Sequence, residues 1–235
     1  MGTLNLLFVF ISLIIGLKVL LRYFKEGKSE FLYVGLTWII YSEIWWSASI
    51  SFLFVLFTGQ SLSLELYFII GNLLVPLGFF VWLVTFTNIK LREKQKIILL
   101  IMAIIGALYE IIFFYFIFTD PSVIGAFRGP IDAEYRSFAL VFLMSGLILF
   151  VITGVFFGYK SLSSSDPIVK LRSKFFLAAF ISFFIGASLD GLKPFLFEES
   201  YLDLIYIINR LILISSSLEF YCSFIMPKFI KKHFL

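Results

Sequence analysis

The chain contains one cysteine, Cys222, and one histidine, His233. A single thiol cannot form an internal disulfide, so cysteine usage says nothing about the redox compartment. Because the histidine lies in the C-terminal tail, the apolar segments cannot hold a histidine-based zinc site, a bis-histidine haem or a serine–histidine dyad. The sequence also lacks a glycine-rich phosphate loop and an HExxH motif. We therefore predict no enzyme activity, no cofactor and no metal site.

Charged residues are scarce as well. They make up 14% of the chain, and hydrophobic residues make up 61%. A soluble domain has about 25% charged and about 45 to 50% apolar residues, so a water-soluble fold is excluded. The net charge of +4 comes from an uneven distribution of Lys and Arg along the chain, and it does not indicate nucleic acid as a partner.

The sequence divides into seven apolar stretches, each long enough to cross a bilayer, which takes about 20 residues. They cover residues 4–24, 31–58, 64–88, 97–118, 138–159, 174–197 and 201–226. The connections between them are too short to fold alone, so residues 1–235 are predicted to form one domain. The predicted fold is all-α: a polytopic seven-transmembrane-helix bundle, multi-pass in a prokaryotic cell membrane, with membrane lipids as partners.

Lys and Arg gather in alternate connections. Of the 19 Lys and Arg residues, 14 lie in the connections after the first, third and fifth stretches and in the C-terminal tail, together with four acids. The other side has only Arg128, Arg136 and Lys193, with seven acids. Short loops rich in Lys and Arg remain cytoplasmic. The N-terminus is therefore predicted outside and the C-terminus inside, with a basic inner rim that attracts anionic lipid headgroups.

Ionisable residues inside the membrane are costly, at about 2.5 to 3.5 kcal/mol each near mid-helix. Counting 1.5 Å of rise per residue places most of them in the middle and outer half of the bundle. We predict that this layer forms a site for a small-molecule ligand from the outer side. Its predicted ligand-binding residues are Glu43, Asn72, Glu110, Asp190, Asn209 and Arg210.

Three carboxyl groups face one guanidinium in this layer. Asp190 is the predicted partner of Arg210, because the sixth and seventh helices are neighbours in sequence and the two residues lie at similar depth. Glu43 and Glu110 would then carry protons. Three interpretations stay open: a ligand or ion site, a satisfied polar network that only fixes helix packing, and a proton relay.

A second polar layer lies towards the predicted cytoplasmic side. If the first and seventh helices are adjacent, Lys18 and Glu219 lie at matching depth and form a structural ion pair. The alternative is that Lys18 extends its ammonium group to the inner interface.

Three further features bear on the outer half. Pro76 predicts a kink in the middle of the third helix. Trp45 and Trp46 lie near the middle of the second, where they could line an aromatic pocket, although packing between helices is the favoured interpretation. The connection 119–137 is rich in turn residues, and a surface loop is favoured over a lid on an outer cavity.

Seven helices and an outside N-terminus resemble the layout of microbial rhodopsins, a family that binds retinal through a lysine in the seventh helix. The stretch Leu202 to Met226 contains no lysine, so covalent retinal is not expected. The run from Ser163 to Leu192, SSSDPIVKLRSKFFLAAFISFFIGASLDGL, resembles the seven-helix sensor regions that precede prokaryotic histidine kinases and cyclases, and stand-alone archaeal proteins of that kind. The resemblance implies a sensory role with a separate signalling partner, either cytoplasmic or in the membrane.

Three functions are therefore carried forward. The leading hypothesis is a receptor-like or sensory module that binds a small molecule or lipid in the outer half of the bundle. The second is a proton-coupled or cation transporter that uses Glu43 and Glu110. The third is a structural subunit of a membrane complex.

Overall fold

The computed structural model describes residues 2–234. Seven of its helical segments are long and apolar enough to span a membrane, which confirms the predicted all-α, seven-helix, multi-pass membrane protein. The helices are α1 (Gly2–Glu26), α2 (Ser29–Tyr41), α3 (Trp46–Thr58), α4 (Leu64–Asn72), α5 (Val75–Lys90), α6 (Gln95–Thr119), α7 (Ser137–Ser161), α8 (Pro167–Leu196), α9 (Leu202–Phe224) and α10 (Lys228–Phe234). The strands are β1 (Gly125–Phe127) and β2 (Ala133–Tyr135).

The sixth span is longer than predicted. Helix α8 begins at Pro167, seven residues before the predicted start at residue 174. The carboxylate of Asp166 accepts a hydrogen bond from the Ile168 N–H at 2.8 Å, and a proline fits the first position of a helix because its missing N–H would have no partner there. The basic residues after Pro167 therefore belong to the helix and not to a loop.

The second and third spans are both interrupted. A single turn of 3-10 helix, η1 (Ser42–Trp45), separates α2 from α3, and the third span breaks between α4 and α5. Pro76, the second residue of α5, has no N–H and its ring clashes with the carbonyl four residues earlier, which belongs to Asn72. The break confirms the predicted kink.

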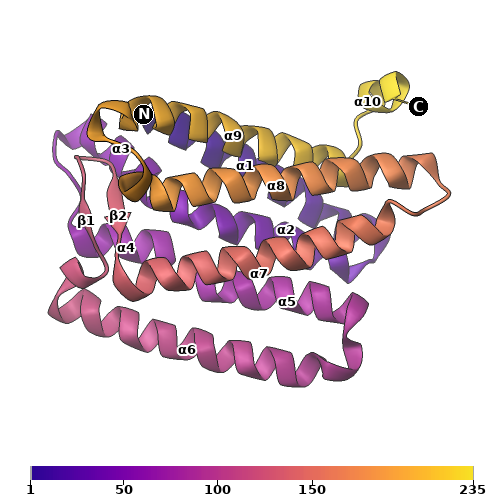
Figure 1. The fold of residues 1–235 in the computed structure, drawn as a ribbon, viewed down its shortest axis with the longest axis horizontal. Helices are drawn as coiled ribbons and strands as arrows, with labels where there is room; N and C mark the ends of the chain where they lie inside the picture. Colours follow the sequence, from indigo (N-terminus) through magenta and orange to yellow (C-terminus); the bar gives the residue numbers. More distant parts are fainter. Residues whose placement is uncertain (1, 235) are drawn as a thin grey trace.

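Six of the seven spans form a ring, and the fourth span, α6, lies outside it. Around the ring, α5, α2, α1, α9, α8 and α7 pack in that order, and α7 returns to α5. Helix α6 runs along the outer side of α5 (Figure 1), and its apolar window is only 22% buried, the lowest value of the seven spans. Hydroxyl groups of Ser12 and Ser217, 3.0 Å apart, join α1 to α9. The first and seventh spans are thus adjacent.

Aromatic rings fill the middle of the bundle. Trp38 stacks on Phe220 with ring centroids 3.9 Å apart, and Tyr41 packs on Phe150 at 4.3 Å. These pairs join α2 to α9 and α7, so the large phenylalanine content of the chain closes the interior of the ring.

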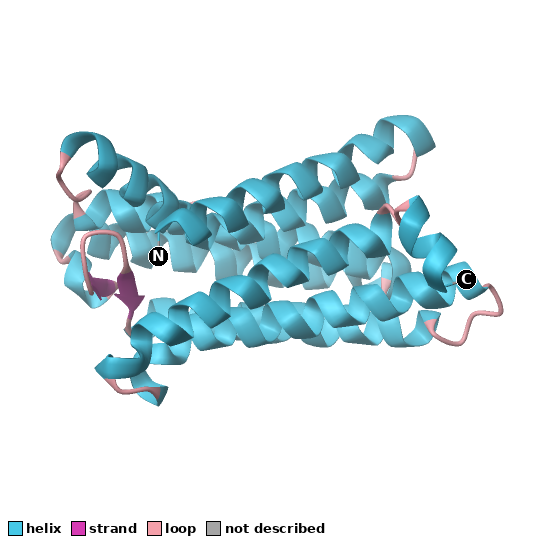
Figure 2. Ribbon diagram, turned by 90° about the horizontal axis from the view of Figure 1, so that it is seen from above, coloured by secondary structure: helices cyan, strands magenta, loops and turns pink. Residues whose placement is uncertain are grey.

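The connection 119–137 is folded onto one end of the bundle. Strands β1 and β2 pair antiparallel, with Gly125 opposite Tyr135, and the hairpin lies at the opposite end of the bundle from α10 (Figure 2). Ile124 is fully buried, and the Pro130 carbonyl accepts a hydrogen bond from Ser51 at 3.0 Å. We name this the hairpin end, predicted to lie outside, and the other the basic end, predicted to lie inside.

The close contact of α1 and α2 yields a stability prediction. A Cβ atom at Gly35 would lie 2.6 Å from the Leu20 nitrogen and 2.7 Å from the Gly16 carbonyl oxygen, both backbone atoms. Gly35→Ala must therefore separate the two helices, and we expect a loss of about 1 to 3 kcal/mol, typical of overpacking. The matched control is Gly129→Ala, where a Cβ meets nothing within 4 Å. Equal thermal midpoints of the two variants in detergent would contradict the packing described.

Candidate functional site

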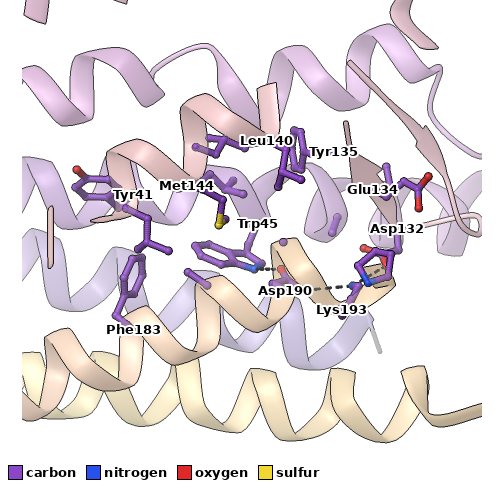
Figure 3. A pocket seen from close by; sticks show the side chains of 18 of the residues that line it. Tyr41, Trp45, Asp132, Glu134, Tyr135, Leu140, Met144, Phe183, Asp190 and Lys193 are labelled. Atoms are coloured by element: carbon purple, nitrogen blue, oxygen red, sulfur yellow. Dashed lines mark hydrogen bonds and ion pairs between the residues drawn. The ribbon is translucent and has the colours of Figure 1, made fainter. Parts of the chain in front are cut away.

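A cavity opens inside the ring at the hairpin end. Its volume is about 60 Å³, and a site of about 10 to 15 Å³ already holds one water molecule, so it has room for a few waters or for a narrow ligand. One end is polar and the walls are apolar (Figure 3). The apolar walls include Tyr41, Leu143, Met144, Leu147 and Phe183, and the polar end includes Asp132, Asp190, Lys193 and Arg210.

Asp190 is the centre of the polar end. Its Oδ2 atom accepts a hydrogen bond from the indole Nε1 of Trp45 at 2.7 Å and lies 3.1 Å from Nη1 of Arg210. Its Oδ1 atom accepts a second hydrogen bond from Arg210, through Nη2, at 3.2 Å. The predicted pair of Asp190 and Arg210 is therefore confirmed, with one charge-assisted hydrogen bond through Nη2 and an ion-pair contact through Nη1.

Lys193 is a second cation at this carboxylate. Its ammonium lies 3.3 Å from Oδ1 of Asp190 and 2.9 Å from Oδ2 of Asp132, on the hairpin. The Lys193 side chain is only 6% exposed. The sequence count grouped Lys193 with the charges of the outer side, although it lies inside the predicted stretch 174–197. In the structure α8 places it one turn beyond Asp190, on the same face. Two cations thus meet two carboxylates, and the predicted excess of acids is absent at this point.

The ring of Tyr206 covers both cations. It lies 4.2 Å from the guanidinium carbon of Arg210 and 5.0 Å from the ammonium of Lys193. The negative face of an aromatic ring attracts cations, so Tyr206 stabilises charges that burial would otherwise make unfavourable.

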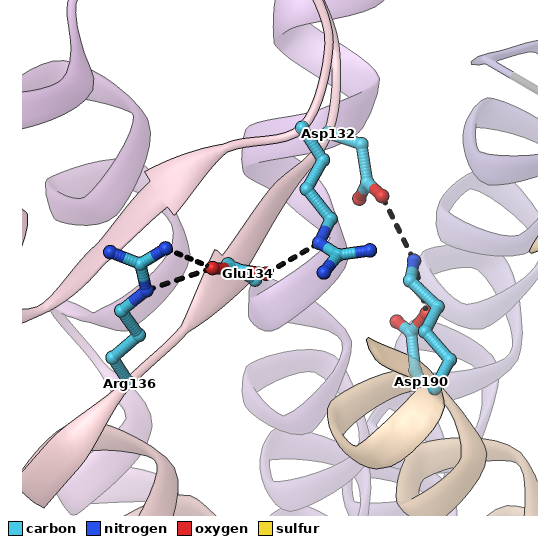
Figure 4. Close-up of polar contacts among 6 residues, drawn as sticks. Asp132, Glu134, Arg136 and Asp190 are labelled. Carbon is cyan, nitrogen blue, oxygen red and sulfur yellow. Dashed lines mark hydrogen bonds and ion pairs between the residues drawn. The ribbon is translucent and has the colours of Figure 1, made fainter. Parts of the chain in front are cut away.

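The hairpin carries an ion-pair network of its own (Figure 4). Glu134 accepts hydrogen bonds from Arg128 and Arg136. Partial burial raises the pKa of the Glu134 carboxyl, but the hydrogen bonds and charges of the two guanidinium groups lower it more, so the pKa lies below its usual value of 4.5. Lys193 and Asp132 join this hairpin to α8.

Asn72 connects the third span to the hairpin. Its Nδ2 donates to the Phe68 carbonyl at 2.8 Å and to the Tyr135 hydroxyl at 3.0 Å, and its Oδ1 accepts from the Tyr109 hydroxyl at 3.4 Å. Tyr135 lines the cavity. Asn72 therefore positions a cavity wall and does not face the cavity itself.

Glu43 lies where the second and third spans are broken. Both of its carboxylate oxygens are 2.9 Å from the Leu74 N–H, a donor at the break before Pro76. A backbone group in the hydrocarbon region must find a partner, and Glu43 supplies one. It is buried at 2% exposure and lies apart from the Asp190 cluster.

Glu110 and Asn209 are the remaining predicted site residues, and neither lines the cavity. Glu110 is half-buried on α6, outside the ring, and its Oε2 has no hydrogen-bond partner within residues 2–234. Asn209 is fully buried on α9, and neither its Nδ2 nor its Oδ1 is hydrogen-bonded in the described part of the chain. The six predicted residues therefore do not form one cluster: the structure unites Asp190 and Arg210 and distributes the others around them.

The predicted ion pair of Lys18 and Glu219 is not formed among the residues that the structure describes, although α1 and α9 are adjacent. The Lys18 ammonium lies over the Tyr221 ring, 5.3 Å from its centroid, and Lys18 is exposed. Glu219 accepts a hydrogen bond from Ser215 at 3.0 Å, one turn earlier on its own helix. Glu219 thus has a partner on its own helix, whereas the aromatic partner of Lys18 lies on α9.

Several site residues were not predicted as such. Asp132 and Lys193 were counted only among the charges of the predicted outer side, and Tyr206 was not predicted as a site residue. The spacing of three residues between Asp190 and Lys193 was the available signal, because it places both on one face of a helix. Trp45 was predicted to line a pocket as the less favoured interpretation, and it does line the cavity, whereas Trp46 donates to Ser42 at 3.0 Å.

No protein-family model, curated protein or solved structure matches the chain. Residues 2–234 contain no group of three or more His, Cys, Asp or Glu side chains that could hold a metal ion.

Removing the central carboxylate should destabilise the fold. Asp190→Asn leaves the buried Arg210 without a charged partner, while Lys193 keeps Asp132, and breaking a buried pair in this way costs about 3 to 5 kcal/mol. The control Asp203→Asn changes an exposed carboxylate at the start of α9 and should cost little. Adding Arg210→Gln to Asp190→Asn should restore part of the loss, measured by thermal or chemical unfolding in detergent. Equal losses in Asp190→Asn and Asp203→Asn would contradict the site.

The hairpin network predicts a dependence on pH. Because the pKa of Glu134 is lower in the folded protein than its usual 4.5, its ionised form stabilises the fold at pH values above about 4.5, and this contribution is lost as the pH falls towards the folded pKa. Wild type should exceed Glu134→Gln in thermal midpoint at neutral pH, and the difference should shrink in acid. Glu198→Gln, at an exposed carboxylate, is the control. A difference that grows in acid would contradict the network.

Proposed function

We propose that this integral membrane protein is a receptor-like or sensory module that binds a small amphipathic molecule in the hairpin-end half of the bundle and signals through a separate protein partner. The observation that carries the proposal is Arg210. This guanidinium is 1% exposed and lines the cavity. Its Nη1 atom is ion-paired with Asp190, whereas its Nε atom has no hydrogen-bond partner among the described residues. Buried donors are rarely left without an acceptor.

The polar end favours an uncharged head group. Arg210 and Lys193 are already balanced by Asp132 and Asp190, so an anionic ligand would add an unpaired charge in a site of low polarity. A hydroxyl or carbonyl oxygen would accept from Arg210 at no such cost. An alcohol, ketone or ester head is the chemistry that suits this end.

The walls favour an apolar tail. From Asp190 to Phe183 the cavity follows seven residues of α8, or about 10 Å at 1.5 Å per residue. Met144 and Leu143 of α7 form the facing wall. A narrow hydrocarbon chain can lie there with its head at Arg210, and the outer hairpin covers the head.

The contacts of Asp190 supply a route for a signal. Its carboxylate accepts hydrogen bonds from Trp45 in the η1 turn of the second span and from Arg210 on α9. Lys193 connects this group to the hairpin through its ion pair with Asp132. A ligand that recruits Arg210 must change its geometry at Asp190, so it binds one arrangement of these elements better than another. Such a difference in affinity is what a ligand-driven conformational change requires.

A transporter is the second candidate, and the two broken spans favour it. Discontinuous helices are typical of ion and substrate sites in secondary transporters. Here the breaks meet at Glu43, which also interacts electrostatically with Glu110. This alternative predicts proton-coupled or cation flux into proteoliposomes that is lost in Glu43→Gln and in Glu110→Gln, while Glu65→Gln retains it.

The binding proposal is tested with a primary alcohol, decanol, that carries a photoreactive diazirine on its tail. Labelled residues mapped by mass spectrometry should come from the cavity walls of α7 and α8. Met144→Trp fills the cavity and should reduce labelling severalfold, because the added ring takes the place of the tail. Val141→Trp adds the same ring to the lipid-facing side of α7, where Val141 is 66% exposed, and should leave labelling unchanged.

Competition then tests the head group. Unlabelled decanol should suppress labelling and decanoate should suppress it less, because only the acid adds a charge. Equal labelling of Met144→Trp and Val141→Trp, or labels confined to lipid-facing residues, would overturn the binding site, and stronger competition by decanoate would overturn the uncharged head.

A further inference from the structure

A second and larger cleft lies at the basic end, far from Asp190. It has a volume of about 540 Å³ and is walled by aromatic rings from five helices. An adjoining cleft of about 260 Å³ shares four of these rings with it, so the two are continuous. The shared rings are Phe31, Phe157, Phe176 and Phe224.

Cations surround this cleft. Lys28 lines its larger part and Arg172 its smaller part. The guanidinium of Arg22 lies 4.6 Å from the centroid of Phe31, and the ammonium of Lys90 lies 6.0 Å from that of Phe157. Two acids are present, since Glu30 lines the cleft and Glu26 pairs with Arg22. The surroundings therefore carry an excess of positive charge.

The Arg172 side chain has one hydrogen-bond donor that is not used within the described residues. Its Nε atom is buried and makes no hydrogen bond to any residue that the structure describes. Arg172 lies in the second turn of α8, and Lys28 directly precedes α2. Both are at the ends of membrane spans, at the level of lipid headgroups, whereas Trp82 and Phe176 lie deeper along their helices.

We propose that this cleft binds an anionic phospholipid, with its phosphate between Arg172 and Lys28 and one acyl chain against the phenylalanine walls. A phosphate oxygen is the acceptor that an unpaired guanidinium nitrogen prefers. The bilayer supplies both the anion and the chain at this depth, and the cytoplasmic leaflet, which this end is predicted to face, is the anionic one. The proposal is independent of the ligand at Arg210.

Trp82 provides the test. It lines the cleft and is 4% exposed, so bulk lipid cannot reach it but a chain inside the cleft can. The full-length protein is placed in nanodiscs that contain either phosphatidylglycerol or phosphatidylcholine with brominated acyl chains, which quench tryptophan on contact. Brominated phosphatidylglycerol should quench wild type more than brominated phosphatidylcholine does. Trp82→Phe should abolish this excess, and Arg172→Gln should reduce it.

Lys94→Gln is the matched control, because Lys94 also lies at the basic end but does not line the cleft; it should retain the excess quenching. The proposal is overturned if brominated phosphatidylglycerol gives no excess, if the excess survives Trp82→Phe, or if Arg172→Gln and Lys94→Gln behave alike. Complete competition by soluble glycerol phosphate would assign the cleft to a soluble anion instead. Loss of the excess on dimerisation would assign it to a second copy of the chain.

Discussion

The partly buried carboxylate of Asp190 is the group on which the hairpin-end half of this protein depends. A charge in the hydrocarbon region persists only if it is paired and hydrogen-bonded, and Asp190 is bonded by Trp45, Arg210 and Lys193. These donors belong to the second, seventh and sixth spans, so satisfying one carboxylate fixes three sides of the ring. Lys193 then attaches the hairpin through Asp132.

The polar residues inside the bundle divide into two kinds. Glu43 and Asn72 have filled hydrogen-bonding positions and hold backbone or hairpin in place. Arg210 is different, because it combines nearly complete burial with an unpaired Nε atom and a place in the cavity wall. Asn209 also has buried polar atoms without a hydrogen bond in the described part of the chain, but it does not line the cavity. The unpaired donor at a cavity is why the binding interpretation is preferred to packing alone at Arg210, while packing suffices for Glu43 and Asn72.

Hydrophobicity predicted the seven spans because the bilayer imposes a length on each of them. Depth counting also predicted the pair of Asp190 and Arg210, which lie on consecutive helices. It failed for Lys193, because hydropathy gives the end of the span but not the direction of a charged side chain near that end. It also failed for Lys18 and Glu219, because residues at equal depth can lie on different faces of their helices. The ion pair of Asp132 and Lys193 joins parts of the chain that are 61 residues apart, and no local sequence pattern predicts it.

The most direct measurement is an experimental structure of the full chain, purified from membranes without added ligand and resolved well enough to show bound lipids and waters. The account predicts elongated density that begins at the unpaired Nε atom of Arg210 and continues along Met144 towards Phe183. A cavity that has closed around Arg210, or one that holds only separate waters, would contradict a ligand site and make the Asp190 network a packing element alone.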